Sequence, residues 1–184
     1  MPRLFTGLEV PADIGFQLSA YRGGLPGARW IEPEQYHMTL RFIGDVDDAA
    51  AREVVAALGE AEPRSPVEVT FEALDSFGGR TPRIIMAKAA ATADLCELQA
   101  EHEQLLRRVG LAPERKRFVP HVTLARLRDT SSAQVAGYLA MHGRFAKLSF
   151  TARRVVLYSS RASTGGGPYV VEAAYPLFAP STGA

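Results

Sequence analysis

The 184-residue chain lacks the features that mark several classes of protein. Its single cysteine, Cys96, excludes an internal disulfide and a zinc site built from several cysteines. Cys96 lies among leucines at helical spacing, which predicts a buried thiol. No apolar run approaches the roughly 20 residues that cross a bilayer, and the opening Met-Pro-Arg-Leu-Phe has no charged leader before an apolar stretch. We therefore expect a reduced, cytoplasmic protein with no membrane segment.

An excess of charge of either sign is also missing, because 21 basic and 20 acidic side chains give a net charge of +1. This balance argues against a protein that coats nucleic acid. The charges are nevertheless separated along the chain. Residues 1–106 carry 9 basic and 17 acidic side chains, whereas residues 107–161 carry 12 basic and 2 acidic ones. The separation predicts either a surface that faces an anion or a solvated arginine-rich face.

The composition that is present, 47% hydrophobic and 22% charged, suits one globular domain over residues 1–184. Helical and strand patterns alternate, and several neighbouring strands have short connections. These features predict the α+β class with antiparallel sheet. Strands are expected at 3–10, 30–43, 67–74, 83–88, 121–126, 153–160 and 169–175, the last two joined by a turn at 165–168, and helices at 11–22, 49–58, 92–109 and 131–141.

A short motif occurs twice in this layout, as Tyr36-His-Met-Thr-Leu40 and as Pro120-His-Val-Thr-Leu124. Each histidine is followed, at the same spacing, by a serine, which is Ser76 in the first case and Ser160 in the second. A turn, a helix and two strands follow each motif. We interpret this as a duplicated module folded about a pseudo-two-fold axis, with the two His-x-Thr strands side by side or facing each other.

Alternation along a strand decides which side chains share a face. In the first motif His37, Thr39 and Arg41 would face one side, and Phe42 would belong to the core. Two such strands would present two imidazoles and two hydroxyls to one cleft, which suits acid and base catalysis on a phosphate. A single His-x-Thr is more simply a half-buried hydrogen-bonded pair, but its repetition favours the catalytic interpretation.

The other histidine patterns point away from a metal site. Neither motif has His-Glu-x-x-His spacing or an acidic neighbour in its strand, so zinc is the weaker alternative. His102 and His142 are expected at the surface or at a helix end. We therefore expect neither a metal nor a cofactor.

The ordered set of motifs resembles the 2H phosphoesterase superfamily, and within it the bacterial and archaeal RNA 2′,3′-cyclic phosphodiesterases, historically called 2′-5′ RNA ligases. The resemblance rests on Arg3-Leu-Phe, Trp30, His37–Gly44, Phe77, Phe118–Arg126, Leu157-Tyr-Ser-Ser160 and Gly167-Pro-Tyr169. It implies two similar lobes related by a pseudo-two-fold axis, each an antiparallel sheet with outer helices, around a central cleft. It also implies metal-independent hydrolysis of RNA 2′,3′-cyclic phosphate ends to 2′-phosphates, with 2′-5′ ligation through the same site.

The resemblance also implies roles for individual residues. By position, His37 would donate a proton to the departing 3′ oxygen, and His121 would accept one from the attacking water. The phosphate would be held by Thr39, Thr123 and Arg126.

Arg126 would point away from Thr123 in a regular strand, so its role requires a bend or bulge after Leu124. Contacts with RNA are expected near the second motif, from Phe118 and from the basic residues Arg115, Lys116 and Arg117. Phe118 as core and the basic residues as a solvated loop are the alternatives.

The expected partners are RNA with 2′,3′-cyclic phosphate ends, with tRNA fragments as candidates, or nucleoside 2′,3′-cyclic phosphates, bound by a monomer. Two other functions stay open. One is a member of the same superfamily that acts on small cyclic nucleotides, and the other is a protein that binds RNA ends without turnover.

Overall fold

The computed structural model describes residues 3–160 and 168–179, in which short strands alternate with helices. The strands are β1 (Arg3–Glu9), β2 (Ala28–Trp30), β3 (His37–Asp45), β4 (Val67–Phe77), β5 (Ile84–Ala89), β6 (His121–Leu127), β7 (Leu148–Ala152), β8 (Arg154–Ser160) and β9 (Tyr169–Pro176). The helices are α1 (Ala12–Ser19), α2 (Asp48–Leu58), α3 (Ala93–Arg108) and α4 (Ser132–Met141), with a 3₁₀ turn at Pro33–Gln35.

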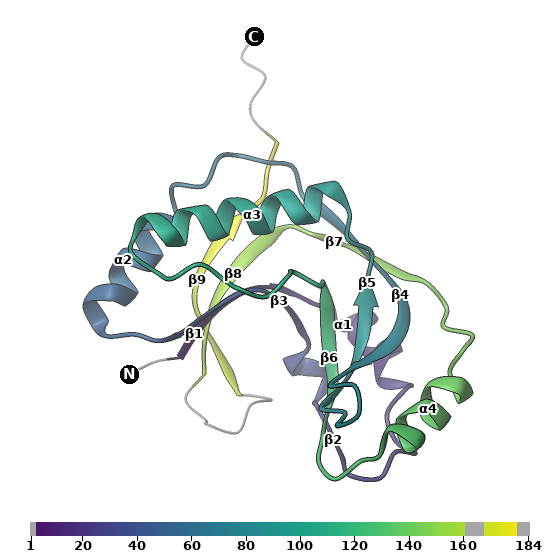
Figure 1. Cartoon of the computed structure of the whole chain (residues 1–184). Coiled ribbons are helices and arrows are strands. Elements are labelled where there is room, and N and C mark those ends of the chain that lie inside the picture. Colours follow the sequence, from purple (N-terminus) through teal and green to yellow (C-terminus); the bar gives the residue numbers. More distant parts are fainter. Residues whose placement is uncertain (1–2, 161–167, 180–184) are drawn as a thin grey trace.

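The strands form one antiparallel sheet with two halves. One half has the order β7-β4-β5-β6 and lies at the right of Figure 1; the other has the order β3-β1-β8-β9 and lies at the left. The halves meet where β6 pairs with β3, through the single register pair Met38 and Val122, which we call the seam. β2 pairs with the far end of β6, beyond the seam.

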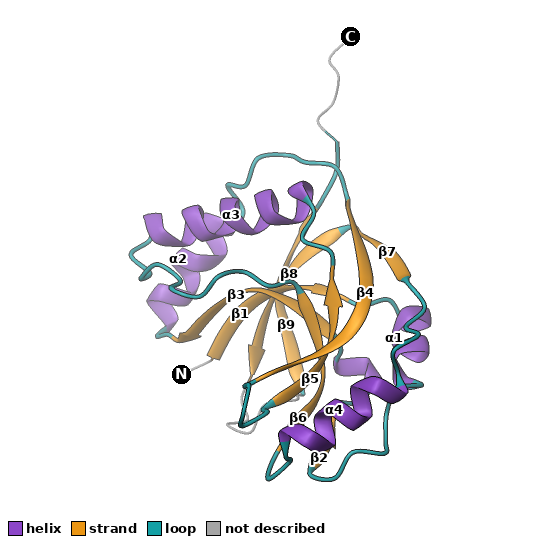
Figure 2. Cartoon of the chain, turned by 45° about the vertical axis from the view of Figure 1, so that its right-hand side comes forward, coloured by secondary structure: helices purple, strands orange, loops and turns teal. Residues whose placement is uncertain are grey.

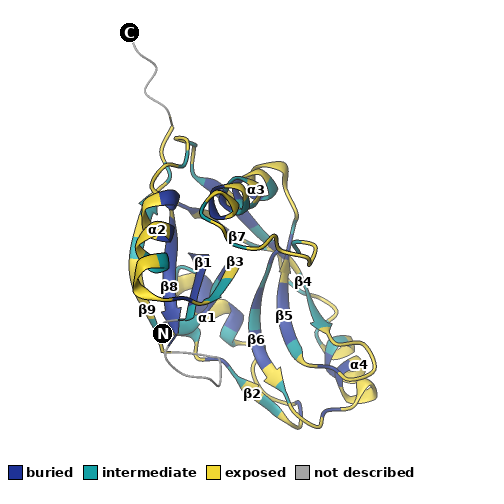
Figure 3. Cartoon of the chain, turned by 60° about the vertical axis from the view of Figure 1, so that its left-hand side comes forward, coloured by how far each residue is buried: buried dark blue, intermediate teal, exposed yellow. Residues whose placement is uncertain are grey.

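The helices cover both half-sheets (Figure 2), and α3 packs against both, because its Leu95 and Leu98 belong to the larger core. Helices α2 and α3 close a core with β1 and β8 that contains Leu4, Val46, Val54, Leu58, Leu106 and Leu157. Helices α1 and α4 contribute Ile14, Leu18, Val135 and Tyr138 to the larger core under β4, β5 and β6. Figure 3 shows that the buried positions run along the strands, whereas the outer sides of the helices are exposed. The predicted α+β class with antiparallel sheet and helices is confirmed.

Side-chain caps fix where the helices after β3 and β6 begin. Asp47 accepts a hydrogen bond from the backbone N–H of Ala50 at 2.8 Å, as the sequence predicts for a helix that starts there. Ser131 and Gln134 form a reciprocal capping box at the start of α4. The two histidine strands therefore each lead into a capped helix after a short turn.

The repeat is visible in the connections. The series β3-α2-β4 matches β6-α4-β8, in which β7 is inserted between α4 and β8, and a motif histidine begins the first strand of each series. The two modules are interleaved, because β4 follows β3 in sequence but lies in the half-sheet of β6, and β8 lies in the half-sheet of β3.

Several boundaries differ from the expectation. The predicted strand at 30–43 is interrupted by the 3₁₀ turn, because Pro33 starts a tight turn that separates β2 from β3. Strand β7 is absent from the predicted elements. Cys96 is half-buried rather than buried. Of the predicted turn at 165–168, residues 165–167 lie outside the described residues, as does Gly167 of the Gly-Pro-Tyr motif.

Candidate active site

The seam brings the two His-x-Thr motifs together. In an antiparallel ladder its register places His37 across from Thr123, and Thr39 across from His121. All four side chains are half-buried, and they alternate with fully buried residues along their strands. They therefore occupy one face of the sheet, as the repeat predicts.

The two imidazoles are oriented in the same way. Nδ1 of His37 donates to the carbonyl oxygen of Gln35 at 3.0 Å, and Nδ1 of His121 donates to that of Val119 at 2.7 Å. Because a carbonyl oxygen can only accept, each ring carries its proton on Nδ1 when it is neutral. Nε2 is then the nitrogen that can exchange a proton with a ligand.

Burial favours the neutral form of both rings. It lowers the pKa of His37 to about 4, against the opposing effect of the hydrogen bond to Gln35. The positive charges of Arg126 and His121 lower the pKa of His37 further. Burial also lowers the pKa of His121, which its hydrogen bond to Val119 partly offsets.

Aromatic rings supply much of this burial, and they surround the two histidines unequally. The ring centroids of Phe5 and Tyr169 both lie 4.9 Å from that of His37, and Tyr158 lies at 5.6 Å. Phe77 contacts His121 edge-on at 5.1 Å. The environment of His37 is therefore the more apolar of the two.

A bulge in β6 turns Arg126 toward the site. The register of β6 against β5 shifts between Thr123 and Ala125, and Leu124 and Ala125 are both buried although they are neighbours. Alternation reverses at this point, so Arg126 emerges on the face of Thr123. The bend that the role of Arg126 requires is present.

The same irregularity occurs in β3, and there it corrects two expectations. Leu40 and Arg41 are consecutive buried residues beside a register shift against β1, so alternation reverses again. Phe42 is 48% exposed and lines the site, whereas Arg41 is only 7% exposed. The assignments of Phe42 to the core and of Arg41 to the histidine face are therefore wrong. Phe42 and Arg126 occupy equivalent positions of the repeat, each at the same spacing from its motif histidine.

Several of these side chains line one open pocket, whose lining includes His37 and Thr39 of the first motif. Its lining consists of Arg3, Phe5, His37, Thr39, Phe42, Arg126, Ser160 and Tyr169. The charged members among these described residues are both arginines, so the pocket suits an anion with an apolar part. A family model described as the 2′-5′ RNA ligase superfamily matches residues 11–164 of this chain.

The chain belongs to the 2′-5′ RNA ligase superfamily.

Two relatives have names that state an activity. A protein named RNA 2′,3′-cyclic phosphodiesterase from Aquifex aeolicus is 30% identical over 147 residues, which cover 78% of this chain and 78% of the relative. A Bacillus subtilis protein of the same name is 29% identical and covers 68% of this chain and 71% of the relative. The solved structure of E. coli LigT complexed with 3′-AMP has a TM-score of 0.75 at 21% identity, covering 96% and 99% of the two chains. This structural likeness shows a shared fold.

Arg41 is buried and makes structural contacts outside the pocket. Its guanidinium pairs with Glu103 on α3 and donates to the carbonyl oxygens of Phe42 and Ala112. Glu103 also accepts from the backbone N–H of Glu114 at 2.9 Å. Burial opposes ionisation of Glu103, but the hydrogen bond and charge of Arg41 prevail and lower its pKa. The pair thus fastens the loop between α3 and β6 to the strand that carries His37.

That loop carries the predicted RNA contacts. Arg115, Lys116 and Arg117 are exposed, and Phe118 is half-buried and packs against the larger core. Of the described residues that line the pocket, none comes from this loop. The pocket-lining residues that were not predicted as site residues are Arg3, Phe5, Phe42, Ser160 and Tyr169, all of which lie in segments on which the resemblance rests. Phe42 could have been placed in the site from its equivalence to Arg126 in the repeat.

Neither a metal cluster nor a membrane span is found in the part of the chain that the structure describes. No group of three or more His, Cys, Asp or Glu residues is placed to hold a metal ion within residues 3–160 and 168–179. Over the same ranges, every helix is too short or too polar to cross a membrane.

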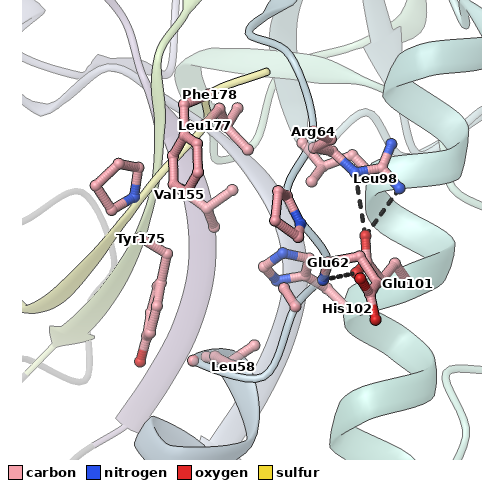
Figure 4. A pocket seen from close by; sticks show the side chains of 14 residues that line it. Leu58, Glu62, Arg64, Leu98, Glu101, His102, Val155, Tyr175, Leu177 and Phe178 are labelled. Carbon is pink, nitrogen blue, oxygen red and sulfur yellow. Dashed lines mark hydrogen bonds and ion pairs between the residues drawn. The ribbon is translucent and has the colours of Figure 1, made fainter. Parts of the chain in front are cut away.

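A second hollow lies between α3, the α2–β4 connection and the end of β9 (Figure 4). His102 lines it and is only 1% exposed, and Nδ1 of its ring has no hydrogen-bond partner among the described residues. Burial lowers the pKa of His102 to about 4. The predicted surface position of His102 is wrong, because it falls on the helical stripe that also contains Leu98 and Leu105. His142 does lie at the end of α4, as expected.

Proposed function

We propose that this chain hydrolyses RNA ends that carry a 2′,3′-cyclic phosphate and leaves a 2′-phosphate. The observation that carries the proposal is the pair of imidazoles with Nε2 available on one face of the seam, beside Thr39, Thr123 and Arg126. The relatives named RNA 2′,3′-cyclic phosphodiesterase support RNA with a cyclic phosphate end as the substrate class.

In the proposed reaction the oxygen of a water molecule attacks phosphorus while Nε2 of His121 takes its proton. The bond from phosphorus to the 3′ oxygen breaks, and Nε2 of His37 gives a proton to that oxygen. The donor and acceptor assignment follows the family resemblance. Thr39, Thr123 and Arg126 donate hydrogen bonds to the non-bridging oxygens, whose negative charge grows in the transition state.

The protonation states constrain this cycle. In the free site burial keeps His37 mainly neutral at pH 7, because its pKa is about 4, whereas its proposed role requires the protonated form. A bound phosphodiester carries a negative charge, which raises the pKa of a nearby imidazole. We infer that substrate binding is coupled to proton uptake by His37, and that Arg126 limits this uptake by lowering the same pKa.

The pocket supports a nucleotide rather than bare phosphate. The exposed ring of Phe42 stands beside His37 and Thr39, where it offers a stacking face for the terminal base. Arg115, Lys116 and Arg117 are proposed to contact the RNA backbone further from the cyclic end. We also propose that tRNA fragments are among the substrates. The enzyme is further proposed to act as a monomer in the cytoplasm.

The test is hydrolysis of adenosine 2′,3′-cyclic phosphate and of a short RNA with a cyclic end, in EDTA, with the 2′- and 3′-phosphate products resolved. We expect a 2′-phosphate product, a bell-shaped pH profile, and a loss of at least about 100-fold in kcat for His37→Ala and for His121→Ala. His142→Ala is the matched control, because that ring lies at the end of α4. Turnover that survives both substitutions would contradict the mechanism, and tight binding without turnover would indicate an RNA-end binding protein.

A further inference from the structure

The pocket contains a second arginine that the proposed reaction does not use. Arg3 begins β1 and lines the same pocket as His37, Phe42 and Arg126. The reacting cyclic phosphate carries one negative charge, and Arg126 with the threonines and histidines already surrounds it with donors. Arg3 therefore supplies a cationic donor beyond what one phosphate requires.

Arg3 is held loosely enough to bind a ligand. Its guanidinium pairs with the carboxylate of Asp45 at 3.4 Å, and the two side chains are 43% and 51% exposed. An ion pair of such exposure and length contributes little to stability. A phosphate, which accepts two parallel hydrogen bonds from a guanidinium, is the stronger partner. Exchange of Asp45 for a phosphate oxygen thus costs little.

The position of Arg3 agrees with the direction of an RNA strand. β1 runs beside β3, pairing Phe5 with Phe42 and Arg3 with Asp45, so Arg3 lies on the far side of Phe42 from the end of β3 that carries His37. A base stacked on Phe42 would separate the cyclic phosphate from Arg3. Because a 2′,3′-cyclic phosphate closes the 3′ end, any second phosphate of the substrate lies on the 5′ side of that nucleotide.

We propose that Arg3 binds the phosphate on the 5′ oxygen of the terminal nucleotide, so that this chain prefers oligonucleotide ends to nucleoside 2′,3′-cyclic phosphates. This inference rests on the proposed function and names its substrate class: the preceding phosphodiester of an RNA strand. A free 5′-phosphate on a single nucleotide has the same charge chemistry and is the alternative source.

Three substrates separate these cases: adenosine 2′,3′-cyclic phosphate, the same nucleotide with a 5′-phosphate, and the dinucleotide ApA with a 2′,3′-cyclic end. We expect the wild type to have a kcat/KM about 10-fold or more higher for the dinucleotide than for the nucleoside, since hydrogen bonds to a charged group are among the strongest in proteins. Arg3→Gln should remove most of that preference, and Arg3→Lys should restore part of it. The salt dependence of the dinucleotide KM should weaken by about one charge in Arg3→Gln.

Two comparisons make the result specific. Arg52→Gln on the exposed side of α2 is the matched arginine control, and Arg126→Gln should lower kcat/KM for all three substrates together. An equal loss on all three substrates in Arg3→Gln, or no loss on any of them, would overturn the inference. Equal rates of wild type on the nucleoside and the dinucleotide would also overturn it, while leaving hydrolysis itself established. A rate advantage confined to the 5′-phosphorylated nucleotide would replace the RNA strand with a small-molecule substrate.

Discussion

Protonation of His102 should make the fold sensitive to acid in a predictable window. His102 is 1% exposed, and burial lowers its pKa to about 4 in the folded chain from an ordinary value of 6.5. The unfolded chain therefore binds this proton first as pH falls. The contribution of His102 to stability is complete above pH 6.5 and is lost as pH falls from 6.5 toward 4.

The magnitude follows from the same two values. Each pH unit between them corresponds to about 1.4 kcal/mol, so by pH 4.5 the protonation of His102 alone removes about 2.5 kcal/mol from the free energy of unfolding. His37 and His121 act in the same direction, because burial lowers both of their pKa values. The dependence of wild-type stability on pH therefore contains contributions from all three histidines, and a variant is needed to isolate that of His102.

The assay is urea unfolding of wild type and His102→Phe at pH 7.5, 6.0 and 4.5. Phenylalanine keeps a ring in the hollow among Leu58, Leu98 and Val155 but cannot be protonated. We expect the wild type to lose about 2.5 kcal/mol more than the variant between pH 7.5 and 4.5. Gln104→Ala, exposed on the same helix, is the control and should follow the wild type. Parallel pH profiles of wild type and His102→Phe would refute the reasoning.

Two further predictions concern the strands beneath the site. Glu103→Gln leaves the buried Arg41 without its counter-charge and should lower the free energy of unfolding, measured in urea, by about 3 kcal/mol. The control Glu97→Gln, exposed on the same helix, should leave that free energy almost unchanged. Equal losses in the two variants would contradict the role of the Arg41–Glu103 pair in fastening the loop. Gly7→Ala would place a Cβ 2.7 Å from a backbone carbonyl oxygen of β3, so it should lose about 1–3 kcal/mol and also lower kcat/KM. In the control Gly137→Ala the new Cβ meets open space in α4, so the variant should be more stable by up to about 1 kcal/mol. A stable, fully active Gly7→Ala would contradict this prediction, because it would show that β1 can shift without displacing β3.

The proximity of the two motif histidines could be predicted from the sequence because its signal was redundant. His37 and His121 occur in matching contexts, and their strands have to lie near each other if the repeat folds about an axis. Arg126 could be placed only conditionally, since strand alternation gives the wrong face unless a bulge follows Leu124. Bulges are set by register against a neighbouring strand, which is a tertiary property that local alternation does not contain.

The errors have the same physical origin. Alternation carried through a bulge assigns Phe42 to the core, although its equivalence to Arg126 in the repeat indicates the opposite face. The flanking Glu101 and Glu103 suggest a surface position for His102. Its spacing from Leu98 and Leu105 gives the correct side of the helix, since neighbours in a helix point in different directions.

The interleaving of β4 and β8 has the geometry of a domain-swapped dimer joined into one chain. A single module would contain one imidazole and one threonine, so a two-histidine site exists only where two modules pair through the seam. In a true dimer of identical copies both halves of such a site have to stay the same. Joining the copies in one polypeptide lifts that constraint, and the repeat differs at position 42 against position 126, where a ring in one half faces a guanidinium in the other. Together with the unequal rings around the two histidines, that difference gives the site a direction, and a strand of RNA has one as well.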